Sequence, residues 1–209
     1  MYTKLKNGKP NEILSKPNWF HEDGTEVTDN TLFKEDAIYP VIDTPPIFNE
    51  YTQTSNQKPL DEWTVNTDNV EIVYEVVDKS LEDSKQVVRF AINQIRYSKI
   101  YNENIPYIFP GDTIPDGIQM RDDIDRQNIQ DIFLDAMNKP SDTIMYFMPV
   151  SNNLKMMTAQ ELITMGLFIK TRGDLIVGYA WDLKQQIDNT ETLEQIETIT
   201  STLEIGWPE

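Results

Sequence analysis

The sequence contains no cysteine and only one histidine among its 209 residues. Without cysteine the chain cannot form disulfides, thiolate metal sites or a cysteine nucleophile, and it suits any redox compartment. A Ser-His-Asp triad would have to use His21, which lies in the turn-like segment Phe20 to Gly24. Turns commonly carry polar residues, so we interpret His21 as an exposed turn histidine.

Motifs that hold phosphates, dinucleotides or catalytic zinc are also missing. The chain has no G-x-G-x-x-G, no G-x-x-x-x-G-K-[ST] and no H-E-x-x-H. No stretch approaches 18 consecutive apolar residues, so no membrane insertion is predicted. The first ten residues contain no apolar core, so we predict no signal peptide and expect synthesis in a cytoplasm.

Basic residues are few: the chain has 18 lysines and arginines and 35 acidic residues, which gives a formal net charge of −17. The basic residues are scattered, whereas binding to nucleic acid requires them in clusters. We therefore expect no nucleic-acid partner and no attraction to an anionic membrane surface. An acidic mimic of DNA is an alternative, but solubility and repulsion between copies explain the charge more simply.

The composition is that of a globular protein, with 39% hydrophobic and 25% charged residues. Nine of the twelve prolines lie before residue 116, and helices exclude proline. The first 79 residues therefore predict strands and long connections. Short strands are expected at residues 25–28, 38–42 and 63–65, and the best strand at 70–77, with one face formed by Val70, Ile72, Tyr74 and Val76.

Four helices are predicted after this region, from apolar spacing and capping signals. They run from Ser80 to about Lys99, from Asp122 or Asp123 to Lys139, from the capping box Thr158-Ala-Gln-Glu161 to Asp188, and through Leu193, Ile196, Ile199 and Leu203. A β-hairpin is expected from residues 144–148 and 154–157, between the second and third helices. The third helix contains Gly166, Gly173 and Gly178, each costing roughly 1 kcal/mol, so tertiary packing must support its length.

The predicted fold class is therefore α+β, with a small β-rich N-terminal attachment region followed by a helical domain with an inserted β-hairpin. We place the two regions at residues 1–79 and 80–209. Residues 106–117 contain three prolines and two glycines and predict a loop, so a boundary at 101–117 is an alternative.

Residues with the potential for chemistry have simpler structural interpretations. Asp122, Asp123 and Asp125 resemble part of a calcium loop, but its glycine is missing and a helix start explains these acids. The methionines at 145–148 and 156–157 are interpreted as core residues of the hairpin. The four tryptophans are dispersed, which favours core or interface positions over a sugar-binding platform. We thus predict no catalytic, cofactor-binding or metal-binding residues and expect no enzyme.

The order of the motifs between residues 80 and 200 resembles an uncharacterised domain of bacteriophage tail-fibre and tail-associated proteins. The resemblance rests on Gly117-Ile-Gln-Met120 before a capped helix, two short strands, and the segments T-A-Q-E-L, A-W-D-L-K-Q-Q-I-D and T-L-E-Q-I. Two departures are Met120-Arg121 in place of a threonine, and Tyr146 or Phe147 in place of the hairpin tryptophan. Trp19-Phe-His-Glu-Asp-Gly24 and Asp61-Glu-Trp63 are similar to segments that precede this domain or occur in tail-fibre assembly proteins.

The resemblance implies a structural protein of the virion: a tail-fibre, baseplate or tail-adaptor subunit that binds other tail proteins. It also implies self-association, with a trimer favoured, and contact with a host surface receptor. A tail-fibre assembly chaperone that is absent from the particle is the alternative. A small carbohydrate-acting enzyme with a carboxylate pair is a second alternative, but no particular pair is singled out.

Overall fold

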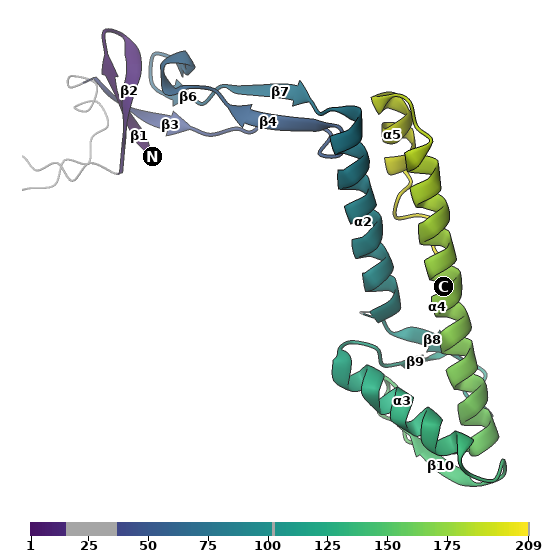
Figure 1. The fold of residues 1–209 in the computed structure, drawn as a ribbon. Coiled ribbons are helices and arrows are strands. Elements are labelled where there is room, and N and C mark those ends of the chain that lie inside the picture. Colours follow the sequence, from purple (N-terminus) through teal and green to yellow (C-terminus); the bar gives the residue numbers. More distant parts are fainter. Residues whose placement is uncertain (16–36, 102, 209) are drawn as a thin grey trace, which may run out of the picture. The chain divides into compact units, whose positions relative to one another are not determined.

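The structure, a computed structural model, describes residues 1–15, 37–101 and 103–208. It divides into two compact units, Met1–Ser80 and Leu81–Glu209. The described part confirms the α+β class, with strands in the first unit and four helices with hairpins in the second (Figure 1). The strand predicted at residues 25–28 lies outside the described residues.

The N-terminal unit is built on a five-stranded sheet with the order β2-β1-β3-β6-β5. The strand β3 pairs antiparallel with β1 and parallel with β6. A short 3-10 helix, η1, precedes β5, and a separate two-stranded ribbon joins β4 to β7. The bounds are β1 Tyr2–Lys6, β2 Lys9–Leu14, β3 Ile38–Ile42, β4 Gln53–Gln57, η1 Leu60–Glu62, β5 Thr64–Val65, β6 Val70–Glu71 and β7 Tyr74–Asp78.

The β1–β2 hairpin was not predicted, although its turn signal is present in the sequence. Asn7 and Gly8 join the strands with φ values of 54° and 76°. Two consecutive residues with positive φ form the type I′ turn that matches the twist of a hairpin, and Asn-Gly is its preferred pair. The polar strand β4 was also missed, because it pairs through its backbone and has no apolar pattern to reveal it.

The prediction of one strand over residues 70–77 is wrong, because the segment changes partners half-way. Val70 and Glu71 belong to the five-stranded sheet, whereas β7 pairs only with β4. At the junction the Ile72 N–H donates to the Ile42 carbonyl at 3.0 Å. The expected apolar face is accordingly buried at Val70 and Ile72 and exposed at Val76, where no layer of the described residues covers the two-stranded ribbon.

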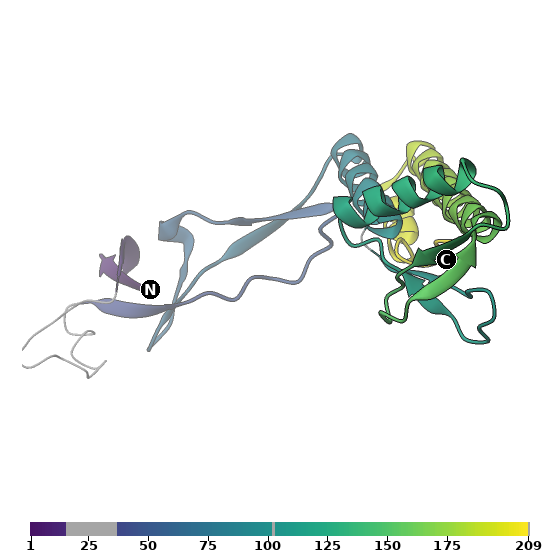
Figure 2. The same cartoon turned by 90° about the horizontal axis from the view of Figure 1, so that it is seen from below.

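The second unit contains two long helices, α2 (Leu81–Tyr101) and α4 (Ala159–Asp188), which lie side by side (Figures 1 and 2). Their contacts are antiparallel, because the start of α2 reaches the end of α4. Lys85 Nζ donates to the Asp188 carbonyl at 2.9 Å, and Arg89 Nε donates to the Asp188 carboxylate at 2.7 Å. The remaining elements are β8 Ile105–Tyr107, β9 Asp116–Ile118, α3 Asp123–Met137, β10 Ile144–Phe147, β11 Lys155–Thr158 and α5 Leu193–Thr200.

The predicted capping box at Thr158 and the predicted β10–β11 hairpin are confirmed, and a second capping box, at Thr192, was not predicted. Thr158 and Glu161 form a reciprocal capping box at the start of α4, and Thr192 and Gln195 form another at the start of α5. The hairpin β10–β11 is antiparallel, with Tyr146 opposite Met156. Asp188 is the last residue of α4, as predicted.

The segment 106–117, predicted to be a loop, contains structure at both ends. Ile105 pairs with Ile118 and Tyr107 with Asp116 in the antiparallel hairpin β8–β9. Phe109 is only 1% exposed and belongs to the main core cluster, together with side chains from β9, α3, the β10–β11 hairpin and α4. These residues lie inside the second unit.

Candidate functional site

The carboxylates Asp122, Asp123 and Asp125 lie at the start of α3, where the residue pattern predicts a cap. The Asp122 carboxylate accepts a hydrogen bond from the Asp125 N–H at 2.9 Å, which satisfies one of the free donors of the first turn. The interpretation of Asp122 as a helix cap is confirmed. In the described ranges, no group of three His, Cys, Asp or Glu residues is arranged to hold a metal ion.

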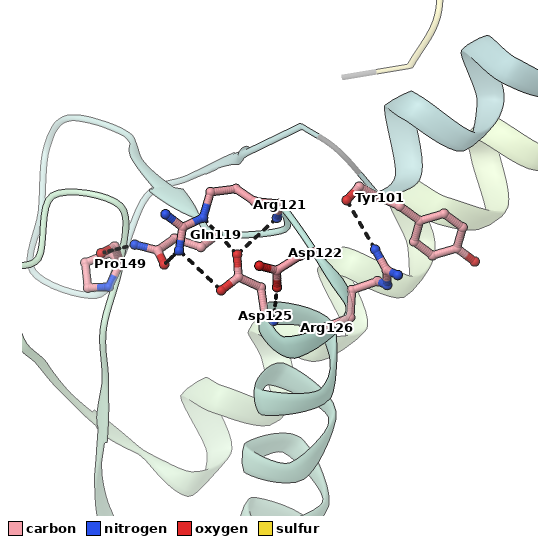
Figure 3. Close-up of polar contacts among 7 residues, drawn as sticks. All are labelled: Tyr101, Gln119, Arg121, Asp122, Asp125, Arg126 and Pro149. Carbon is pink, nitrogen blue, oxygen red and sulfur yellow. Dashed lines mark hydrogen bonds and ion pairs between the residues drawn. The ribbon is translucent and has the colours of Figure 1, made fainter.

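Asp125 connects the helix start to the β10–β11 hairpin through a chain of polar contacts (Figure 3). The Arg121 guanidinium and its backbone N–H both donate to the Asp125 carboxylate, at 2.9 and 3.1 Å. The same guanidinium donates to the Gln119 side-chain oxygen at 2.7 Å, and the Gln119 amide donates to the Pro149 carbonyl at 3.2 Å. The chain of bonds fixes α3 relative to the end of β10.

Replacing Arg121 by alanine is expected to raise the pKa of Asp125 toward its ordinary value. The Arg121 hydrogen bond is the main cause that lowers this pKa, with partial burial acting in the opposite direction. A lowered folded-state pKa stabilises the protein above the unfolded-state pKa, and the contribution is lost as the pH falls through the folded-state value. Carboxyl-carbon NMR titration measures the change, and Arg126→Ala is the control, because Arg126 pairs with Asp123 instead. An unchanged Asp125 pKa in Arg121→Ala would contradict the assignment.

A second contact ties the start of α3 to the end of α2. The Arg126 guanidinium lies 4.6 Å from the centre of the Tyr101 ring, a cation–π arrangement, and donates to the Tyr101 carbonyl at 3.4 Å. It also forms an ion pair with Asp123. The three aspartates thus form hydrogen bonds or ion pairs with groups at the start of α3 and immediately before it.

An open pocket of about 290 Å³ lies between α3 and β10, next to this network. Gln119, Asp125 and Asn128 supply its polar lining. The apolar lining consists of Ile129, Ile132, Tyr146, Phe147 and Met148.

The β10–β11 hairpin is apolar on both of its faces. Met145, Phe147 and Met157 point into the core and are at most 7% exposed. The residues that alternate with them are between 48 and 71% exposed. We call these five residues the hairpin face: Ile144, Tyr146, Met148, Leu154 and Met156. The prediction that the methionines fill the core is therefore confirmed for Met145 and Met157 and wrong for Met148 and Met156.

A functional-looking residue that the sequence did not reveal is Arg172, which is 5% exposed in the middle of α4. Its guanidinium donates to the Lys99 carbonyl at 2.7 Å and lies 3.8 Å from the Glu103 carboxylate. It borders an open pocket of about 350 Å³ that Trp207 also lines. Arg172 thus ties α4 to the last turn of α2.

Another polar group joins the two hairpins of the second unit. The Asp116 carboxylate accepts from the Ser151 hydroxyl at 2.5 Å and from the Gly117 N–H at 2.7 Å. The Ser151 hydrogen bond lowers the pKa of Asp116, and weak burial opposes it. Asp116 is thus held as a carboxylate that fixes the β10–β11 turn.

The remaining sequence candidates are placed as follows. His21 and Trp19 lie outside the described residues. Trp63 and Trp207 are buried, and their indole N–H groups donate to the Lys58 and Leu203 carbonyls, as expected for core residues. Trp181 is 61% exposed on α4.

Residues 83–201 match the sequence model of a protein family described as "Domain of unknown function (DUF4376)". The matched segment is more than half of the chain and runs from the first turn of α2 through α5. The chain belongs to this family. The DUF4376 domain spans nearly the same residues as the motif resemblance described above, but the family's description assigns no function. No curated protein and no solved structure matches the chain.

Within the described residues, no helix of the DUF4376 domain or of the N-terminal unit is both long and apolar enough to cross a membrane.

Proposed function

We propose that this protein is a structural component of a bacteriophage virion: a tail-fibre, baseplate or tail-adaptor subunit that works by binding other proteins. The proposal combines the motif resemblance with the construction of the N-terminal unit. The DUF4376 domain would be the part carried by the attachment unit, available for self-association and for contact with a host receptor.

The observation that carries the proposal is the small core of the N-terminal unit. Five apolar residues are buried in its described part: Pro10, Ile38, Trp63, Val70 and Ile72. In the β4–β7 ribbon no apolar side chain is fully buried and only Tyr74 is partly buried, against the core of the unit, and an isolated two-stranded ribbon is marginally stable in water. A unit of this kind gains stability when a partner covers it.

Exposed apolar residues of the same unit support binding of a partner at the β3–β4 connection and on the ribbon. Ile47 and Phe48 lie in the connection between β3 and β4, and Ile47 is fully exposed. Val76 and Val77 are exposed on the ribbon that follows. Extended chains with free edges and exposed apolar side chains are typical of segments that bind by strand addition.

The proposal is tested on virions of the phage that encodes the chain. We expect mass spectrometry of purified particles to find the protein at a fixed copy number per tail, and particles lacking it to have altered tails or impaired adsorption. An assembly chaperone would be needed for tails but absent from the particle. Unchanged tails with normal adsorption would refute both functions.

A pair of variants tests whether the N-terminal unit makes the attachment. Ile47→Asp adds a charge to its exposed apolar surface and is expected to reduce incorporation into virions at least tenfold. Ile114→Asp is the matched control, because Ile114 is 74% exposed in the DUF4376 domain. This variant is expected to leave incorporation unchanged. Equal incorporation of the two variants would place the attachment elsewhere.

A further inference from the structure

We propose that the hairpin face binds the hairpin face of a second copy, so that the chain forms a twofold homodimer through β10–β11. The inference names a contact for the self-association in the proposed function, and its biological role rests on that function. The dimer itself is a property of the purified chain and is tested separately.

The sequence of the hairpin is that of a sheet covered on both sides. A sheet with one solvated face alternates apolar and polar residues, whereas near-continuous apolar strands are typical of sheets buried on both faces. Here β10 reads Ile-Met-Tyr-Phe and continues into Met148, yet the described residues cover only the side of Met145 and Phe147. The described residues therefore supply no layer that covers the other side of the hairpin.

The five residues of the hairpin face form one patch. Tyr146 lies directly opposite Met156 in the strand register, and Ile144 precedes Tyr146 on the same side. Met148 and Leu154 follow where the strands join the turn. The exposed apolar residues of α4 are not continuous in this way, because the Lys170–Asp174 ion pair lies between Leu167 and Leu175.

The charge of the chain favours a second copy at this patch over other contacts between copies. With a net charge of −17, two copies repel each other across most of their surfaces. The hairpin face carries no charged residue, so pairing it with itself buries no charge within the patch. A twofold axis places an apolar patch against an identical one, which is the isologous contact of most homodimers.

The size of the patch is sufficient for a weak but specific dimer. Five side chains of this exposure present about 600 Å² per copy, so the dimer would bury about 1,200 Å², the lower limit of stable interfaces. We therefore expect dissociation in the micromolar range, on the order of 1–100 μM. A twofold dimer also differs from the trimer that the family resemblance implies.

Sedimentation velocity of the full chain over this concentration range tests the proposal. The mass is expected to rise from 24.3 kDa to twice that value. Met156→Lys, at a position that is 71% exposed, should raise the dissociation constant at least tenfold, while Leu175→Lys, at 57% exposure on α4, should leave it unchanged. Circular dichroism checks that both variants are folded.

Cross-linking provides a second measurement, since the natural chain has no cysteine and any introduced thiol is unique. Under oxidation, each of the single variants Tyr146→Cys and Met156→Cys should give disulfide-linked dimers. The single variant Leu175→Cys should stay monomeric. A monomer at all concentrations would overturn the proposal. So would a trimer, or a dimer that Met156→Lys leaves intact.

Discussion

Replacing Phe109 by alanine is expected to lower the free energy of unfolding of the DUF4376 domain by about 3–5 kcal/mol. Phe109 is among the largest fully buried side chains, and its ring centre lies 5.0 Å from that of Tyr107 and 5.6 Å from that of Phe147. Alanine would leave a cavity between the β8–β9 and β10–β11 hairpins and remove both aromatic contacts. Urea unfolding followed by circular dichroism measures the loss.

The control for this substitution lies in the same segment. Ile114 is 74% exposed, so Ile114→Ala is expected to change the free energy of unfolding by no more than about 0.5 kcal/mol. If Phe109→Ala were equally mild, the segment 106–117 would behave as the loop and boundary that its prolines and glycines suggest.

The three glycines of α4 are expected to respond to alanine with opposite signs. A Cβ atom at Gly166 would lie 2.2 Å from the Phe133 ring of α3, so Gly166→Ala is expected to cost about 1–3 kcal/mol through overpacking. At Gly173 and Gly178 the same atom meets nothing within 4 Å. Alanine there should stabilise the helix by up to about 1 kcal/mol.

Thermal unfolding of the three single variants measures these opposite effects on stability. The melting temperature should fall for Gly166→Ala and rise for the other two. The double variant Gly166→Ala with Phe133→Leu should recover part of the loss, because the smaller side chain leaves room for the added methyl group. A rise in melting temperature for Gly166→Ala alone would show that α3 and α4 do not need glycine for their close approach.

Elements specified by local signals could be predicted from the sequence. The boundaries of α4 follow from Thr158, Glu161 and Asp188, all within one turn of the ends they define. The β10–β11 hairpin follows from its apolar strands and polar turn. The start of α3 likewise needs only Asp122 and the free N–H groups beside it.

Features that depend on distant partners could not be predicted. The strand β8 has three residues, one of them Pro106, and exists because β9 pairs with it. The burial of Arg172 depends on the carbonyl of Lys99, 73 residues earlier. The division of residues 70–77 between two sheets depends on pairing with β3 and β4, and the polar strand β4 has no apolar pattern that marks its position. The exposure of the hairpin face was not predicted for a related reason. An apolar pattern indicates that a residue is buried, but it does not distinguish burial within the chain from burial against another chain.

The pairing of α2 with α4 also determines the order in which the DUF4376 domain becomes complete during synthesis. Val88 and Ile92 of α2 are fully buried, and Lys85 bonds to a residue 103 positions later. At translation rates of 5–20 residues per second, α2 leaves the ribosome about 5–20 s before the end of α4. The α3 and β10–β11 segments have closer neighbours and can associate within that interval. The helix α2 is thus synthesised first but stays without its partner α4 for several seconds. During that time its apolar face must avoid aggregation or be bound by a chaperone.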